Sequence, residues 1–352
     1  MDPSPTLGAA VTQIPTPNFS TPKSGSLKRF RLGVGVLGIG NWLLLLVLLP
    51  SLAAAGERYA VIISGAAGGE KYAAQHQRWR AGLAVALKTT FTFDDANVAV
   101  LDEESRGTSQ ATAENLRRLL GDLHRRLTRD DTLLLVLLGH GTFDGTDAKF
   151  NLVGPDLSAG EWKGLLEGMA GRLVVVNTTE SSFPFLEELS QRGRVVVTAT
   201  DSAAQRFATV FPEYFVQALG ATSSDLDKNG RVSIWEAFAA ASAGVKEYYD
   251  QKGQLSTERP LLDDDGDRVG REAEAPGQDG RLARTVYLDP EPGSASADAA
   301  MAALDRQRVR LESQLEDLKE RKESMSDAEY QAELEKILVQ LARVAQQIRS
   351  RS

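Results

Sequence analysis

DDTLLLVLLGHGTFDG, residues 130–145, is an apolar run that leads directly into a His-Gly pair and then into turn residues. Leu and Val without polar alternation predict a strand that is buried on both faces. LVVVNTTESS, residues 173–182, repeats this arrangement with a Val-rich run followed by amide and hydroxyl side chains. Ligands of parallel sheets bind beyond the carboxyl ends of the strands, so His140 and Thr179 are expected where a site would be assembled.

The chain around these two segments alternates short apolar runs with stretches of helical period. This alternation is typical of a mostly parallel sheet covered by helices. Besides the two strands above, strands are predicted at 59–64, 97–101 and 194–200. A helix is expected after the first strand, where Tyr72, Trp79, Leu83 and Leu87 share one face. The predicted fold class is therefore α/β, a mostly parallel sheet flanked by helices over residues 56–290.

The Gly-His-Gly turn after one core strand and the polar end of the next resemble the caspase and legumain-like cysteine peptidases. The resemblance implies a caspase-like three-layer sandwich, with a catalytic His after the first strand and a catalytic Cys after the second. It also implies that the amide beside the His holds the oxyanion. The matching residues are His140, Gly141 and Thr179. The family's second strand typically ends in Asp-x-Cys, whereas this chain has Asn177, Thr178 and Thr179 and contains no cysteine.

The residue at the nucleophile position decides what this resemblance implies about activity. A thiol is a usable nucleophile near neutral pH, whereas a Thr hydroxyl needs strong activation by an adjacent base. The resemblance, which covers roughly residues 57–270, therefore implies an inactive peptidase relative that binds or scaffolds a peptide or protein. The alternative is an active hydrolase that uses Thr179 or Ser181 with His140. Glu180 makes this alternative less favourable, because a carboxylate raises the free energy of a negatively charged oxyanion near it.

DLDKNGRVSIWE, residues 225–236, matches the twelve-residue calcium loop position by position. Gly230 allows the sharp turn, and helical stretches lie on both sides, as in an EF-hand. Oxygen-rich, flexible coordination suits Ca²⁺. The alternative is an acidic turn without a metal. The predicted ligands are the side chains of Asp225, Asp227 and Asn229, the Arg231 carbonyl, the Ser233 side chain or a water beside it, and the bidentate Glu236 carboxylate.

A second acidic segment, LLDDDGDRVG at residues 261–270, has Asp263, Asp265 and Asp267 at alternating positions around Gly266. Because no Glu closes the pattern, it fits either a second ion loop or a solvated turn. RTVYLDP, residues 284–290, is read as a late strand, and residues 291–298 as a linker.

The C-terminal stretch, residues 299–352, has two amphipathic helical stripes with a break at SMSDAE. Ser326 and Glu329 form a capping box that is expected to start the second helix. The predicted module is an antiparallel helical hairpin or coiled coil. Two interpretations stay open, a hairpin packed on itself and an arm for self-association or a partner helix. The second would make the chain a calcium-dependent assembly protein.

The N-terminal region differs in composition from the rest of the chain. Residues 1–31 are polar, rich in Pro, Ser, Thr and Gly, end in KRFR and are expected to be disordered. Residues 32–55 form an apolar run that ends in LAAAG, which predicts a cleaved signal peptide. The run is also long enough for a membrane anchor. Either way, the globular part is expected to be exported to the periplasm or the extracellular space, without disulfides.

The overall composition narrows the class of protein further. The chain has 352 residues, of which 42% are hydrophobic, which is enough for one large α/β domain with appendages. Its net charge of −8 argues against nucleic acid as a partner. Two histidines besides His140, His76 and His124, lie in charged helical surroundings and are expected at the solvated surface.

Overall fold

The structure, a computed structural model, describes residues 56–290 and 299–350. The polar region 1–31, the apolar segment 32–55 and the linker 291–298 of the sequence analysis lie outside these described residues. Within the described part of the chain, no helix has the length and apolar character to cross a membrane.

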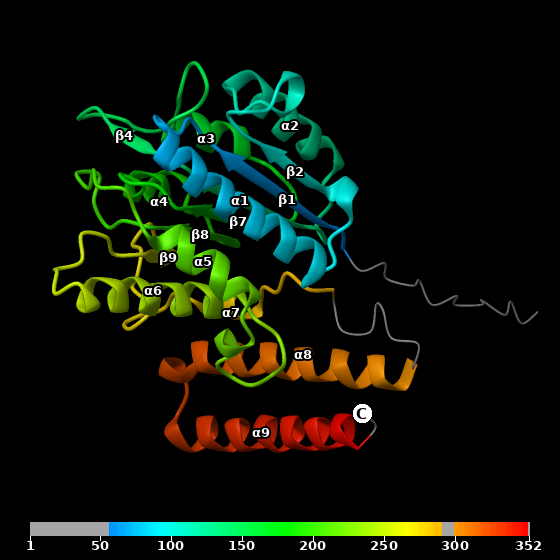
Figure 1. The fold of residues 1–352 in the computed structure, drawn as a ribbon. Coiled ribbons are helices and arrows are strands. Elements are labelled where there is room, and N and C mark those ends of the chain that lie inside the picture. Colours follow the sequence, from blue (N-terminus) through cyan, green and yellow to red (C-terminus); the bar gives the residue numbers. More distant parts are fainter. Residues whose placement is uncertain (1–55, 291–298, 351–352) are drawn as a thin grey trace, which may run out of the picture. The chain divides into compact units, whose positions relative to one another are not determined.

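The central sheet has six strands in the order β2-β1-β3-β7-β8-β9 (Figure 1). Five of them are parallel, and β9 runs antiparallel to β8. The α/β fold class with a mostly parallel sheet flanked by helices is thus confirmed. The strands are β1 Arg58–Ser64, β2 Val98–Leu101, β3 Thr132–Leu138, β7 Arg172–Asn177, β8 Arg194–Thr198 and β9 Leu261–Asp263.

Helices cover both faces of this sheet (Figure 1). On one face lie α1 Glu70–Thr89, α5 Phe211–Gly220 and α6 Ile234–Gln251. On the other lie α2 Ala113–Arg126, α3 Ala159–Leu166 and α4 Phe183–Leu189. Successive strand residues alternate between the two cores, as Leu134 and Val136 face one and Leu133 and Leu135 the other. This double burial explains why the strands read as unbroken apolar runs.

Several small elements were not expected from the sequence. The predicted turn after His140 forms a three-stranded antiparallel sheet of β4 Gly141–Phe143, β5 Ala148–Phe150 and β6 Leu157–Ser158. Strand β9 lies in the acidic segment, and Leu262 exchanges backbone hydrogen bonds with Arg271 on the side away from β8. The predicted late strand is the short helix α7 Arg281–Thr285, followed by a single bridge at Tyr287. The 3₁₀ helices are Asp95–Asn97, Gly107–Ser109, Thr222–Ser224 and Lys322–Ser324.

The C-terminal helices are α8 Ala299–Glu320 and α9 Asp327–Arg349, which lie side by side (Figure 1). The Ser326 hydroxyl accepts from the Glu329 amide and donates to the Glu329 carboxylate, so the predicted capping box is present. Leu311, Leu318 and Val344 are buried in this hairpin.

Candidate functional site

The polar ends of the two core strands lie next to each other. β3 and β7 are adjacent and parallel, with Leu137 opposite Asn177, so the residues after them meet at one edge of the sheet. A Cβ atom on Gly141 would lie 2.6 Å from Thr179 Oγ1 and 2.3 Å from the Glu180 carbonyl oxygen. Such distances are far below van der Waals contact, so only glycine fits at position 141. The structure therefore brings Gly141 and Thr179 together.

Thr179 is enclosed by its own strand end. Its side chain is fully buried. Its hydroxyl lies 2.8 Å from Asn177 Oδ1 and 3.1 Å from the Glu180 carbonyl oxygen, and its amide also donates to Asn177 Oδ1. In the described part of the chain, no hydrogen bond joins Thr179 to His140. The Asn177 side chain thus binds the hydroxyl of the residue that the sequence analysis matched to a catalytic cysteine.

His140 has a carboxylate partner instead. Its Nδ1 lies 2.7 Å from Glu180 Oε1, and both side chains are largely buried. The hydrogen bond to the Glu180 carboxylate raises the pKa of His140, burial opposes this, and the Glu180 charge and a hydrogen bond to the Ala67 backbone raise it further. The sequence analysis treated Glu180 only as an obstacle to an oxyanion. The structure shows it holding the imidazole, which favours the charged form.

His76 is a residue that the sequence analysis placed wrongly. We expected it at the surface, but it is 3% exposed, whereas His124 is exposed as expected. The ring centroid of His76 lies 5.2 Å from that of His140 and 5.6 Å from that of Trp79. Burial, and next the neighbouring His140, lower the pKa of His76 to about 4. A neutral His76 therefore lies against the more basic His140.

Ser181 lies beside this pair but is bonded elsewhere. Its backbone has φ 53°, in the left-handed region, and its amide and its hydroxyl both donate to the Gln205 carbonyl at 2.9 Å. Four buried polar atoms at this edge have no hydrogen-bond partner in the described residues. They are His76 Nδ1, Asn177 Nδ2, Glu180 Oε2 and Gln205 Nε2. Unpaired buried polar groups cost about 1–3 kcal/mol each, so their clustering marks this edge as a binding site candidate.

The predicted calcium loop joins two helices. It follows α5 and a short 3₁₀ turn and leads into α6. Carboxylate oxygens of Asp225, Asp227 and Glu236 lie within 4.8 Å of one another. Gly230 has φ 85°, the left-handed conformation that the sharp turn needs. Three of the predicted ligand side chains therefore lie close to one another.

The remaining loop residues are held by hydrogen bonds. Glu236 Oε1 accepts from the Leu226 and Asp227 amides, and Glu236 Oε2 accepts from the Ser233 amide and hydroxyl at 2.8 Å. Asn229 Oδ1 accepts from the Arg231 amide. Burial, and next the Glu236 charge, raise the pKa of Asp227, which shows how closely these acids are grouped. The chemistry of this donor set fits Ca²⁺, with Ser233 acting as the N-cap of α6.

The second acidic segment is organised differently from the sequence pattern. Asp263, Asp265 and Asp279 have carboxylate oxygens within 4.8 Å of one another, whereas Asp267 is exposed and accepts from the Val269 amide. Asp263 accepts from the Ser190 hydroxyl and from the Arg268 amide at 2.7 Å. Burial raises the pKa of Asp279 to about 7, the hydrogen bond from the Asp264 amide opposes this, and the neighbouring acids raise it further. Asp279 lies too far along the chain for the sequence pattern to include it.

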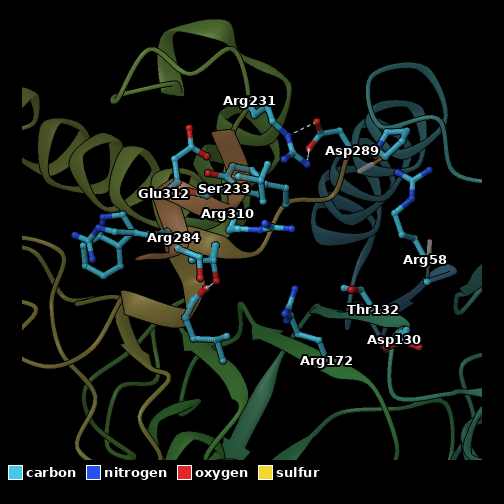
Figure 2. Close-up of a pocket in the computed structure, with 18 of the residues that line it drawn as sticks. Arg58, Asp130, Thr132, Arg172, Arg231, Ser233, Arg284, Asp289, Arg310 and Glu312 are labelled. Atoms are coloured by element: carbon cyan, nitrogen blue, oxygen red, sulfur yellow. Dashed lines mark hydrogen bonds and ion pairs between the residues drawn. The ribbon is translucent and has the colours of Figure 1, made fainter. Parts of the chain in front are cut away.

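A cavity of about 1720 Å³ lies at the opposite edge of the sheet, near the amino ends of β1, β3 and β7 (Figure 2). Its walls include Arg58, Thr132 and Arg172 from these strands, and Arg231 and Glu236 from the calcium loop. It is remote from His140, because residues before and after a strand lie at opposite edges. Its size alone does not make it the reactive site, since the orphaned polar atoms and the His-Glu pair lie at the other edge.

Comparisons with known proteins give similarities of structure only. No model of a known protein family matches the chain, and no curated protein matches it in sequence. Two of the structural neighbours are caspases. Caspase-1 from Spodoptera frugiperda has a TM-score of 0.41 at 11% identity, with 60% of this chain and 87% of that chain covered. The Drosophila initiator caspase Dronc has a TM-score of 0.37 at 13% identity, with coverages of 62% and 82%. A structural-genomics protein from Geobacter sulfurreducens has a TM-score of 0.37 at 15% identity, with coverages of 58% and 92%.

Proposed function

We propose that this chain is a calcium-binding relative of the caspase and legumain-like peptidases that has no peptidase chemistry and acts by binding a peptide or protein. The observation that carries the proposal is the state of Thr179, which is fully buried and bonded to Asn177 at the nucleophile position. A nucleophile must reach both its base and a substrate carbonyl. An enclosed hydroxyl meets neither requirement.

His140 supports the same proposal. A general base has to be neutral and within hydrogen-bond reach of the group that it deprotonates. His140 bonds Glu180 through Nδ1 at 2.7 Å, and among the described residues no hydrogen bond joins His140 to Thr179 or Ser181, whose hydroxyls are bonded elsewhere.

The competing function, a hydrolase that uses Thr179 or Ser181, has less support. Ser181 donates its hydroxyl hydrogen to the Gln205 carbonyl, and Glu180 brings negative charge to the place where an oxyanion would develop. Both features would have to change before either hydroxyl could attack a carbonyl.

The test is turnover of a broad fluorogenic peptide mixture by the wild-type chain and by His140→Ala, with Ca²⁺ and with chelator. We expect no turnover above buffer in any condition. Turnover that is lost in His140→Ala would overturn the proposal and point to a hydroxyl nucleophile.

Calcium is the second part of the proposal. Asp225, Asp227, Asn229 and Glu236 would hold the ion with side-chain oxygens, and Arg231 with its carbonyl. The bound ion would supply positive charge that relieves the repulsion among the three grouped carboxylates. Export through residues 32–55, by cleavage or with an anchor, would expose the loop to abundant extracellular calcium.

Calorimetric titration with Ca²⁺ tests this part directly. Binding to one site that competes poorly with Mg²⁺ is expected, because Mg²⁺ dehydrates reluctantly and prefers a smaller octahedral site. Absence of heat at millimolar Ca²⁺ would leave the loop as an acidic turn.

A further inference from the structure

The calcium loop is the place where the C-terminal part of the chain is attached to the α/β domain. The Ile234 amide donates to the Val286 carbonyl at 2.9 Å, and Ser233 forms a bridge with Tyr287. A loop strand that would pair with a second calcium loop in a tandem arrangement pairs here with the chain's own later segment. This backbone pairing fixes the loop against the residues that precede the linker.

Arg231 strengthens the attachment with its side chain. It donates to both carboxylate oxygens of Asp289, at 2.6 and 2.8 Å, and its guanidinium lies 3.9 Å from the centroid of the Tyr287 ring. Figure 2 shows the Arg231–Asp289 pair at the wall of the cavity. The Tyr287 hydroxyl in turn accepts from Asn229 Nδ2 at 3.1 Å. Two of the predicted loop ligand residues are thus tied to the segment 286–289.

Helix α8 reaches the same loop. Arg308 Nη1 donates to the Asn229 carbonyl at 2.8 Å. One turn later, Glu312 lines the cavity together with Asp227 and Glu236, and its side chain is only 24% exposed. Burial, opposed next by Arg308, raises the pKa of Glu312, and Asp227 and Glu236 raise it further. Figure 2 labels Glu312, Ser233 and Arg231 among the residues that line this cavity.

The charges of this contact depend on whether a cation occupies the loop. Without one, Glu312 brings a fourth carboxylate near Asp225, Asp227 and Glu236, and like charges in a partly buried place repel. Arg308 and Arg231 offset part of this repulsion, and a divalent cation in the loop would add further positive charge near Glu312. The Arg308 bond uses a backbone carbonyl, which is not among the predicted ligands, so it is compatible with a bound ion.

We propose that Ca²⁺ in the loop 225–236 holds the α8–α9 hairpin against the α/β domain, with Glu312 as the residue that responds to the charge of the loop. The inference rests on the proposed calcium binding. Because coupling between two binding events is reciprocal, a docked hairpin also raises the affinity of the loop for Ca²⁺. Removal of the ion weakens the hairpin's contact with the domain and exposes its inner face to another partner.

The first test compares Ca²⁺ affinities of the full chain, Glu312→Gln and Glu335→Gln by calorimetry. The two variants lose the same charge from the hairpin, but Glu335 is exposed on α9. Glu312→Gln is expected to bind Ca²⁺ about fivefold more weakly, the lower end of typical coupling. Glu335→Gln is expected to match the wild type. Equal affinities for all three proteins would overturn the inference.

The second test measures hairpin docking without reference to affinity. The chain has no cysteine, so spin labels attach only at the introduced pair Ala243→Cys and Lys336→Cys, both at exposed positions of α6 and α9. Electron–electron distance measurements are expected to give one narrow distribution with Ca²⁺ and a broad one with chelator. If the chain binds Ca²⁺ but the distance distribution is the same with and without it, the coupling between the ion and the hairpin is refuted and the calcium binding is not. A chain that binds no Ca²⁺ would refute the calcium part of the proposed function as well.

Discussion

The contact between Gly141 and Thr179 gives a sharp prediction for Gly141→Ala. The added methyl carbon would lie 2.3 Å from the Glu180 carbonyl oxygen, 2.6 Å from Thr179 Oγ1 and 3.3 Å from Thr179 Cβ. Ordinary contacts need about 3.5 Å. Neither neighbour can yield easily, because one is backbone and the other is a fully buried side chain. The two strand ends would have to separate.

Overpacking of this kind costs about 1–3 kcal/mol. For a domain of this size, that loss lowers the melting temperature by roughly 2–4 °C per kcal/mol. Equilibrium unfolding in guanidinium chloride, followed by circular dichroism, measures the free energy of unfolding directly. The domain is expected to stay folded, since typical stabilities are about 5–15 kcal/mol.

Gly164→Ala is the matched control. Gly164 lies in α3, and no atom lies within 4 Å of the position that its Cβ would take. Alanine in a helix is about 1 kcal/mol more favourable than glycine, so this variant is expected to be as stable as the wild type or more stable. The reasoning fails if Gly141→Ala unfolds at the same denaturant concentration as Gly164→Ala, because the two strand ends would then not be in contact.

The other predictions concern titration, metal binding and chemistry. The folded-state pKa of His76 is lowered to about 4 from 6.5, so its contribution to stability is complete above pH 6.5 and is lost as the pH falls toward 4. The loss is on the order of 3 kcal/mol, and His76→Gln is expected to lack this part of the pH dependence in unfolding curves. Glu236→Gln is expected to weaken Ca²⁺ binding about tenfold or more in calorimetry, while Asp267→Asn, at an exposed acid outside the loop, leaves it unchanged. Thr179→Cys is expected to show no turnover of fluorogenic peptides, because the side chain at position 179 is fully buried and, among the described residues, has no hydrogen bond to His140; a measurable rate would contradict the enclosure of that position.

The sequence was most informative where burial is continuous. β3 and β7 could be predicted because both faces of these strands are covered, which leaves no polar residue in the run. Strand β9 could not, because its three residues end in Asp263, and its pairing with β8 depends on distant chain segments. The capping box of α9 was predicted because its hydrogen bonds are local.

In the candidate site, too, features set by local sequence could be predicted and features set by distant segments could not. The positions of His140 and Thr179 followed from strand ends, but the partner of His140 did not, because side-chain direction after a strand is set by the loop. His76 was misplaced because its helical face was judged from charged neighbours, although Trp79 and Leu83 lie three and seven residues later on the buried side.

The pairing of Leu262 with Arg271 has a consequence for assembly. An open edge strand offers its backbone groups to any similar strand of another molecule. Here Leu262 gives both its amide and its carbonyl to Arg271, at 2.9 and 2.8 Å, on the outer side of β9. A strand of a second copy therefore cannot form backbone hydrogen bonds with Leu262 on this side of β9. Growth of one molecule's sheet into the next is therefore blocked at the β9 edge.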